Sequence, residues 1–177
     1  MTETDKRWLV GALKNCGALK YGDFTLTSGK KSRYYIDVKT AITKPDLLRA
    51  IARGMAPHAA GCARIAGVEL GAVPIAAAVS LETGIPYVMV RKEKKEHGTQ
   101  KAFEGEMRSG DRVLFVEDVV TTGGTLVKSI ESMRASGAAI EKVVCVVDRG
   151  EGGRENLGKI GVALLSLLTA EDLLAGA

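Results

Sequence analysis

Two adjacent carboxylates, Glu117 and Asp118, follow an apolar run and stand shortly before a stretch of hydroxyls and glycines, Thr121–Thr125. After this stretch the apolar residues recur at helical spacing, which predicts a strand, an acidic pair, a glycine loop and a helix start. Glycines let backbone N–H groups approach a ligand, and a helix N-terminus adds unpaired N–H groups and a positive dipole end. The loop therefore suits a phosphate. The carboxylates repel phosphate and suit sugar hydroxyls or a divalent cation, so the stretch predicts a sugar-phosphate site.

An ordinary strand-to-helix turn capped by a threonine is the simpler interpretation of this stretch. Two carboxylates on a buried strand are costly without a partner, which favours the site. The stretch is not a triphosphate-binding loop, since no Lys follows the glycines. It is not a dinucleotide fingerprint either, since Gly-x-Gly-x-x-Gly is absent.

A second candidate is the basic segment 91–101, where five Lys or Arg and two Glu side chains leave a net charge of +3. The whole chain carries +4, so its positive charge is concentrated here. A solvated charged loop is the ordinary interpretation of such a run. The segment begins, however, where the predicted strand 87–90 ends, and open parallel sheets bind ligands at such ends. This position favours a polyanionic ligand.

A third candidate is Arg149, which follows the apolar run 143–147, a pattern typical of a central parallel strand. An Arg at the carboxyl end of a strand can bind a carboxylate through two N–H groups. The alternative is a surface ion pair with the neighbouring Asp148.

Strand-like and helix-like patterns alternate along the chain. The predicted strands are 21–29, 34–37, 64–67, 87–90, 113–116, 143–147 and 162–165; the predicted helices are 8–13, 45–57, 74–84, 126–133 and 169–174. A glycine-rich loop is predicted at 152–158. The alternation predicts an α/β fold, a parallel sheet with helices on both faces, whose strand ends bring the candidate residues to one crevice.

Composition narrows the class of protein. A length of 177 residues suits one domain, and 46% hydrophobic residues is ordinary for a folded protein. No apolar run approaches the ~20 residues that span a bilayer, and the polar N-terminus lacks a signal-peptide core. A cytoplasmic protein is therefore expected. Three scattered cysteines and two histidines offer no metal-binding spacing.

Three motifs carry a resemblance to a known family. Residues 113–125 closely resemble the phosphoribosyl pyrophosphate (PRPP) motif of the type I phosphoribosyltransferases. The positions Arg91, Lys92, Lys95, His97 and Gly98 match the mobile catalytic loop of that family. The pattern from Phe24 to Tyr35 resembles the N-terminal hood of the orotate phosphoribosyltransferases, where Tyr34 and Tyr35 offer a flat surface for a base or simply pack in a sheet.

The resemblance implies a fold, a reaction and partners. The fold would be the parallel-sheet type I phosphoribosyltransferase fold, with residues 1–177 as a single domain and a small hood formed mainly by residues 1–40 plus C-terminal elements. The reaction would transfer the phosphoribosyl group from PRPP to orotate, giving orotidine 5′-monophosphate and pyrophosphate in de novo pyrimidine (UMP) biosynthesis, with Mg²⁺. Relatives are homodimers that share the basic loop across subunits. Neither a nucleic acid nor a membrane partner is expected.

The resemblance also assigns roles to residues. The catalytic group is Lys95, His97 and Arg91, and the orotate-binding residues are Thr121 and Arg149; no metal ligand is assigned. The PRPP-binding residues are Arg91, Lys92, Lys95, His97, Glu117, Asp118, Val119, Val120, Thr121, Thr122, Gly123, Gly124 and Thr125.

The sequence departs from the family pattern at two positions. Thr27 stands where some relatives have a Lys that reaches the substrates, and Leu70 stands where some have a pyrophosphate-binding Lys. Pyrophosphate contacts from the turn 68–74 would therefore come from main-chain N–H groups. One alternative is a transferase acting on a purine or uracil. The other is a regulatory protein that keeps the pocket as a sensor and binds nucleic acid, although no helix-turn-helix extension is visible.

Overall fold

The structure is a computed structural model of the 177-residue chain and describes residues 1–25, 29, 31–92 and 102–175. The strands are β1 (Leu19–Thr25), β2 (Lys31–Ile36), β3 (Arg64–Val68), β4 (Tyr87–Val90), β5 (Phe103–Glu104), β6 (Val113–Val120), β7 (Lys142–Asp148) and β8 (Ala163–Thr169). The helices are α1 (Glu3–Asn15), α2 (Val38–Ile42), α3 (Pro45–Met55), the 3-10 helix η1 (Ala56–Ala59), α4 (Ala72–Thr83), α5 (Gly124–Ala135), α6 (Gly153–Lys159) and α7 (Ala170–Leu174).

The main sheet has six strands in the order β5-β4-β3-β6-β7-β8. All neighbours pair in parallel except β5, a two-residue strand that pairs antiparallel with β4 at one edge. The predicted α/β class and parallel sheet are confirmed, and the antiparallel edge strand is an addition. Because these strands are parallel, the carboxyl ends of β4, β3, β6 and β7 all lie at the same end of the sheet.

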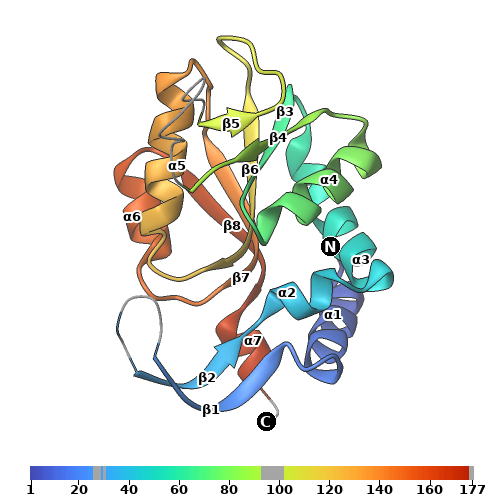
Figure 1. The fold of residues 1–177 in the computed structure, drawn as a ribbon. Coiled ribbons are helices and arrows are strands. Elements are labelled where there is room, and N and C mark those ends of the chain that lie inside the picture. Colours follow the sequence, from blue (N-terminus) through green and yellow to red (C-terminus); the bar gives the residue numbers. More distant parts are fainter. Residues whose placement is uncertain (26–28, 30, 93–101, 176–177) are drawn as a thin grey trace.

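Helices cover both faces of this sheet (Figure 1). One hydrophobic cluster joins α1, α3 and α4 to one face, and a second joins α5 and α6 to the other. Successive residues of β6 divide between the two clusters: Leu114 and Val116 belong to the first, Val113 and Phe115 to the second. This alternation follows from the pleat of a strand. It explains why the run reads as continuously apolar, since both of its faces are buried.

A separate two-stranded antiparallel sheet, β1–β2, lies beyond the carboxyl ends of the parallel strands (Figure 1). Helices α1 and α7 are joined by an ion pair of 2.8 Å between Lys6 and Asp172. A second link is a hydrogen bond of 2.8 Å from Lys14 Nζ to the carbonyl of Ala175. The first and last helices, α1 and α7, therefore pack together near β1 and β2 (Figure 1).

Three predictions about elements are corrected. Residues 152–158, predicted as a loop, contain the helix α6, because Gly152 adopts φ +97° and turns the chain into a helix that buries Leu157. Helix α1 begins at Glu3, five residues earlier than predicted, because Thr2 and Asp5 form a capping box. Trp8, predicted on its apolar face, is 50% exposed.

Candidate active site

The predicted phosphate loop lies between a strand and a helix. Strand β6 continues past the predicted end at residue 116 to Val120, so it includes the acidic pair, and α5 begins at Gly124. Gly123 takes the left-handed conformation, φ +72°, and its carbonyl accepts the hydrogen bond of 2.9 Å from Val127 N–H. A glycine N-cap has no side chain to satisfy the first N–H groups of the helix. These donors are therefore open to an anion at the carboxyl end of β6.

Glu117 and Asp118 are both half-buried at the end of β6, and each accepts a hydrogen bond from the next backbone N–H. Asp118 N–H donates to Glu117 Oε1 at 3.0 Å, and Val119 N–H donates to Asp118 Oδ1 at 2.8 Å. Burial raises the pKa of the Glu117 carboxyl well above its usual range, and the neighbouring Asp118 charge raises it further. Part of the Glu117 side chain still reaches solvent at the sheet edge. A ligand that brings hydroxyls or a cation would relieve this repulsion.

The turn after β3 packs directly against this acidic pair. A Cβ on Gly71 would overlap the Asp118 carboxylate, so a larger residue there would have to displace the Asp118 side chain. Lys39 of α2 approaches the same carboxylate at 3.8 Å, on Asp118 Oδ2. On its other side the turn reaches β4, since Lys92 N–H donates to Glu69 Oε1 at 3.0 Å. The ends of β4, β3 and β6 thus form one continuous surface.

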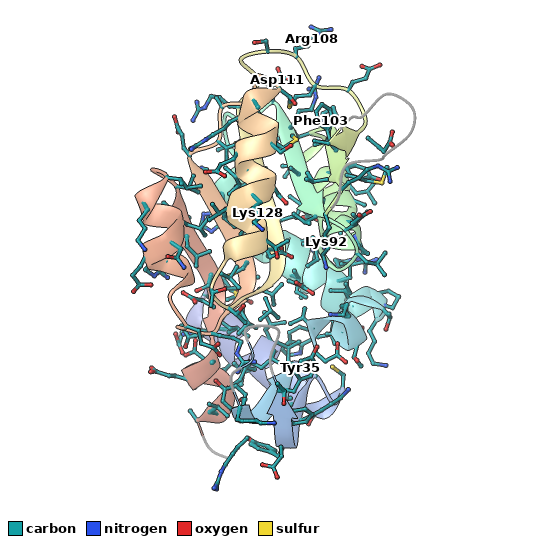
Figure 2. All side chains as sticks on the ribbon, turned by 60° about the vertical axis from the view of Figure 1, so that its left-hand side comes forward. Tyr35, Lys92, Phe103, Arg108, Asp111 and Lys128 are labelled. Atoms are coloured by element: carbon teal, nitrogen blue, oxygen red, sulfur yellow. The ribbon has the colours of Figure 1, made fainter. Side chains whose placement is uncertain are left out.

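Arg91 begins the basic segment and is held at the edge of the sheet. Its backbone N–H donates to the carbonyl of Ala102 at 2.9 Å, and its Nη2 lies 2.7 Å from Glu104 Oε1. Lys92, labelled in Figure 2, follows directly and is exposed. Its positive charge partly offsets the rise of the Glu117 pKa. Lys95 and His97 lie outside the described residues, so the rest of this prediction is untested.

Arg149 lies just past the end of β7 and contacts the β1–β2 sheet. Its side chain is 3% exposed, with Nε 2.7 Å from Glu151 Oε1. The guanidinium carbon lies 4.7 Å from the ring centre of Tyr34, and Nη2 donates to Ser32 Oγ at 3.3 Å. The alternative of a surface ion pair with Asp148 is wrong, because Asp148 pairs instead with Arg154 at 3.1 Å.

Sequence reasoning did not anticipate four residues around the candidate site: Lys39, Glu104, Glu151 and Asn156. It placed the turn that contains Glu69 and Gly71 at the site, but not the contacts of these two residues with Lys92 and Asp118. Most come from elements distant in sequence from the residue that they contact, so no local pattern pointed to them. Glu151 is the exception. It stands two residues after Arg149 and has the opposite charge. Because a buried charge needs a partner, this spacing could have predicted the ion pair.

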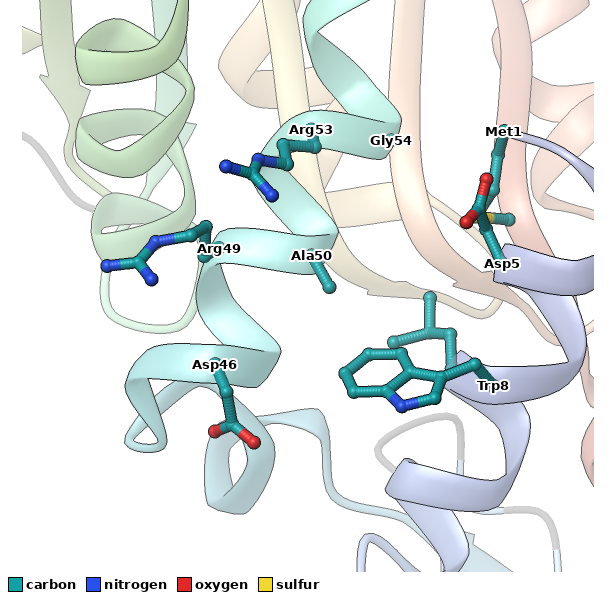
Figure 3. A pocket seen from close by; sticks show the side chains of 9 residues that line it. Met1, Asp5, Trp8, Asp46, Arg49, Ala50, Arg53 and Gly54 are labelled. Atoms are coloured by element: carbon teal, nitrogen blue, oxygen red, sulfur yellow. The ribbon is translucent and has the colours of Figure 1, made fainter.

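Two hollows are lined by other residues, although Ser32 in the second accepts a hydrogen bond from Arg149. One of about 420 Å³ lies between α1 and α3 beside Trp8 and Arg53 (Figure 3). The other, of about 480 Å³, is lined by Asp23, Phe24, Lys31, Ser32 and Arg33 of β1 and β2. Neither contains a predicted site residue. The candidate site is therefore recognised by its chemistry and by its position at the strand ends.

Comparison with known proteins decides the family. Residues 42–161 match the phosphoribosyl transferase domain family. Over 174 residues the chain is 52% identical to an orotate phosphoribosyltransferase of Methanosarcina acetivorans, covering 97% of this chain and 93% of that protein. The chain belongs to the orotate phosphoribosyltransferase family.

Solved structures of orotate phosphoribosyltransferases agree with this assignment. The Aeropyrum pernix protein superposes with a TM-score of 0.86 at 36% identity, covering 94% of this chain and 96% of that one. The Mycobacterium tuberculosis protein in complex with PRPP gives 0.78 at 29% identity, covering 96% and 98%. The predicted resemblance and the type I phosphoribosyltransferase fold are thus confirmed. Within the described residues, no helix has the length and apolarity needed to cross a membrane.

Proposed function

We propose that this protein transfers the phosphoribosyl group from PRPP to orotate, releasing orotidine 5′-monophosphate and pyrophosphate in UMP biosynthesis. It is a pentosyltransferase, as its family membership indicates. The observation that carries the proposal is the acidic strand end of β6, which runs into an open helix N-terminus close to a buried arginine. This arrangement offers separate partners for a phosphate, a ribose and a carboxylate.

The PRPP contacts follow the charges at the end of β6. The backbone and hydroxyl donors of Thr121–Thr125 hold the 5-phosphate, since that stretch lies between a strand end and the uncapped N–H groups of a helix. Glu117 and Asp118 accept hydrogen bonds from the ribose hydroxyls. Glu117 Oε1 and Asp118 Oδ1 each accept one backbone N–H, and Asp118 Oδ2 lies 3.8 Å from Lys39 Nζ.

The leaving pyrophosphate is stabilised by the basic segment, through Arg91, Lys92, Lys95 and His97. Cleavage at the anomeric carbon builds negative charge on the departing group, and positioned cations stabilise that charge. Lys95, His97 and Arg91 form the catalytic group. The ion pair with Glu104 fixes the guanidinium of Arg91 beside the first residues of the segment.

Arg149 binds the carboxylate of orotate, with Thr121 beside the base. The ion pair with Glu151 occupies Nε, while Nη2 makes only a weak contact of 3.3 Å with Ser32. The outer edge of the guanidinium can therefore meet a carboxylate with two N–H groups. Tyr34 lies against the face of the guanidinium and helps to hold its orientation.

Magnesium fits the donors at this strand end. Two adjacent carboxylates, one of them with its pKa raised by burial and by its neighbour's charge, favour a divalent cation nearby. Glu117 and Asp118 would hold the ion together with substrate oxygens, and the ion would supply positive charge for the leaving pyrophosphate.

A homodimer is supported by an apolar surface on α4 and β4. Three large apolar side chains are exposed there, Leu81, Tyr87 and Met89, and a fourth, Leu70, is exposed in the turn before α4. Helix α4 carries apolar residues all around, which is typical of a helix covered on every side. The basic segment starts at the end of β4, next to this surface, so a second copy docked there could share the segment. The chain itself forms one domain, with β1, β2 and the terminal helices as the hood.

The direct test is loss of orotate absorbance when PRPP and magnesium are added together to the purified protein. Consumption of orotate with formation of pyrophosphate is the expected result. Consumption of a purine or of uracil instead would redirect the proposal to another base. If no base is consumed but nucleic acid shifts in a salt-dependent manner, the protein is a regulator.

A further inference from the structure

Helix α6 packs against the outside of the Thr121–Gly123 turn. It begins at Gly153, five residues after β7, and contacts the turn at two consecutive carbonyl groups. The sequence gives no hint of this contact, because the segment was predicted to be a loop. In each of the two peptide groups, the direction of the carbonyl fixes the direction of the following N–H.

The first carbonyl belongs to Thr121 and lies against Gly153. A Cβ on Gly153 would stand 2.7 Å from the Thr121 oxygen and 2.5 Å from Val120 Cγ1. Both distances are too short for a side chain, so only glycine allows the helix to approach the turn this closely. The Thr121 carbonyl therefore points toward α6.

The second carbonyl belongs to Thr122 and is bound by the Asn156 side chain. Asn156 Nδ2 donates to this oxygen at 2.9 Å. Lys159 Nζ donates to Asn156 Oδ1 at 3.0 Å, which settles which end of the amide faces the turn. The Thr122 carbonyl therefore also points toward α6.

Both peptide bonds that follow these carbonyls are trans. In a planar trans peptide the N–H points opposite to the C=O. The N–H groups of Thr122 and Gly123 consequently point away from α6, toward the open side of the turn. Two consecutive donors with one orientation form an anion-binding concavity.

We infer that Asn156 and Gly153 are positioning residues for phosphate binding: through the carbonyls of Thr122 and Thr121 they turn two consecutive N–H groups toward the 5-phosphate of PRPP. The inference rests on the proposed function, in which this turn binds the phosphate. Neither residue touches the substrate. Their contribution appears in affinity for the sugar phosphate and not in affinity for the base.

Two pairs of matched variants test the inference. N156L removes the donor without adding charge, and N15L makes the same change at the exposed end of α1. G153A places a methyl group against the Thr121 carbonyl, and G158A adds the same methyl in the same helix where nothing lies within 4 Å. Binding of ribose 5-phosphate is measured by calorimetry, and the KM values for PRPP and orotate by steady-state kinetics.

N156L and G153A are expected to weaken ribose 5-phosphate binding and raise the KM for PRPP about tenfold, the effect of about one hydrogen bond. The KM for orotate should stay within about twofold, and N15L and G158A should match the wild type. The inference fails if N156L binds ribose 5-phosphate normally, if G153A behaves as G158A does, or if both KM values rise equally. If G153A does not fold, N156L alone decides.

Failure of the proposed function gives a different result. A wild-type protein that binds ribose 5-phosphate but consumes no orotate would disprove the proposed reaction, while the variants still judge the role of α6. A wild-type protein that binds no ribose 5-phosphate would disprove both.

Discussion

Replacing Arg149 by Met separates two roles of one buried side chain. Arg149 is 3% exposed and faces Glu151, which is 17% exposed, at 2.7 Å. R149M keeps most of the side-chain volume but leaves the Glu151 carboxylate buried without a counter-charge. The same change removes the proposed orotate partner. Stability and substrate affinity should therefore both fall, for different reasons.

The magnitude of the stability loss follows from the contacts. Removing one partner of a buried ion pair costs about 3–5 kcal/mol. The lower end of this range applies here for two reasons. Glu151 keeps some exposure to solvent. The pair is also a close ion contact without aligned hydrogen bonds, since within the described part of the chain neither Arg149 Nε nor Glu151 Oε2 has a hydrogen-bond partner. We expect R149M to lose about 3 kcal/mol of unfolding free energy. The double variant R149M/E151L, which buries no charge, should recover to within about 1 kcal/mol of the wild type.

Orotate affinity should behave differently. A charged hydrogen-bonded contact contributes about 1.5–3 kcal/mol, so the KM for orotate should rise about 10- to 100-fold in R149M, and the KM for PRPP should change by less than about twofold. The double variant should restore stability but not orotate affinity. Urea unfolding at fixed protein concentration and steady-state kinetics measure the two quantities.

Three results would refute this reasoning. A fully stable R149M would show that Glu151 is not held by Arg149. Recovery of the orotate KM in R149M/E151L would show that Arg149 does not bind the carboxylate. Equal increases in both KM values would show that Arg149 supports the structure of the whole active site and does not bind orotate specifically.

Three further predictions use other parts of the molecule. K95A should lower kcat about a hundredfold or more with an unchanged thermal unfolding midpoint, and an unchanged kcat would remove Lys95 from catalysis. The pKa of Glu117 is raised in the folded protein. Wild-type stability is therefore greatest below the pKa that Glu117 has in the unfolded chain, and it falls as pH rises through the pKa that Glu117 has in the folded protein. The stability advantage of E117Q in urea should grow with pH, and a constant difference would contradict this. L81D places a charge on a side chain that is 88% exposed, and it should convert a dimer to a monomer in sedimentation; a wild-type monomer would disprove the proposed interface.

Much of the fold could be predicted from local patterns. Residues 113–125 specify a strand, a glycine turn and a helix because apolar periodicity and glycine conformation act over a few residues. The regular alternation of strands and helices then gave the parallel sheet. Terminal helix α7 was also found, because Thr169 and Asp172 form a capping box that is visible in the sequence.

Local patterns failed where a contact decided the outcome. The segment around Gly152 and Gly153 reads as a loop, since glycine disfavours helices by up to about 1 kcal/mol per residue. Burial of Leu157 and close approach to the Thr121 carbonyl stabilise the helix instead. The strand end of β6 was placed four residues early, because charged residues rarely continue a buried strand unless a site occupies its end.

The sequence by itself determined the fold class, the family, and the residue types that we propose to bind the sugar phosphate, because these depend on spacing along one segment. Tertiary structure alone decided which partners those residues have. It paired Arg149 with Glu151 and Tyr34, set Lys39 and Gly71 against Asp118, and bound the Thr122 carbonyl to Asn156. Most of these partners come from elements far apart in the chain, and a contact between such elements is fixed by packing and not by any local pattern.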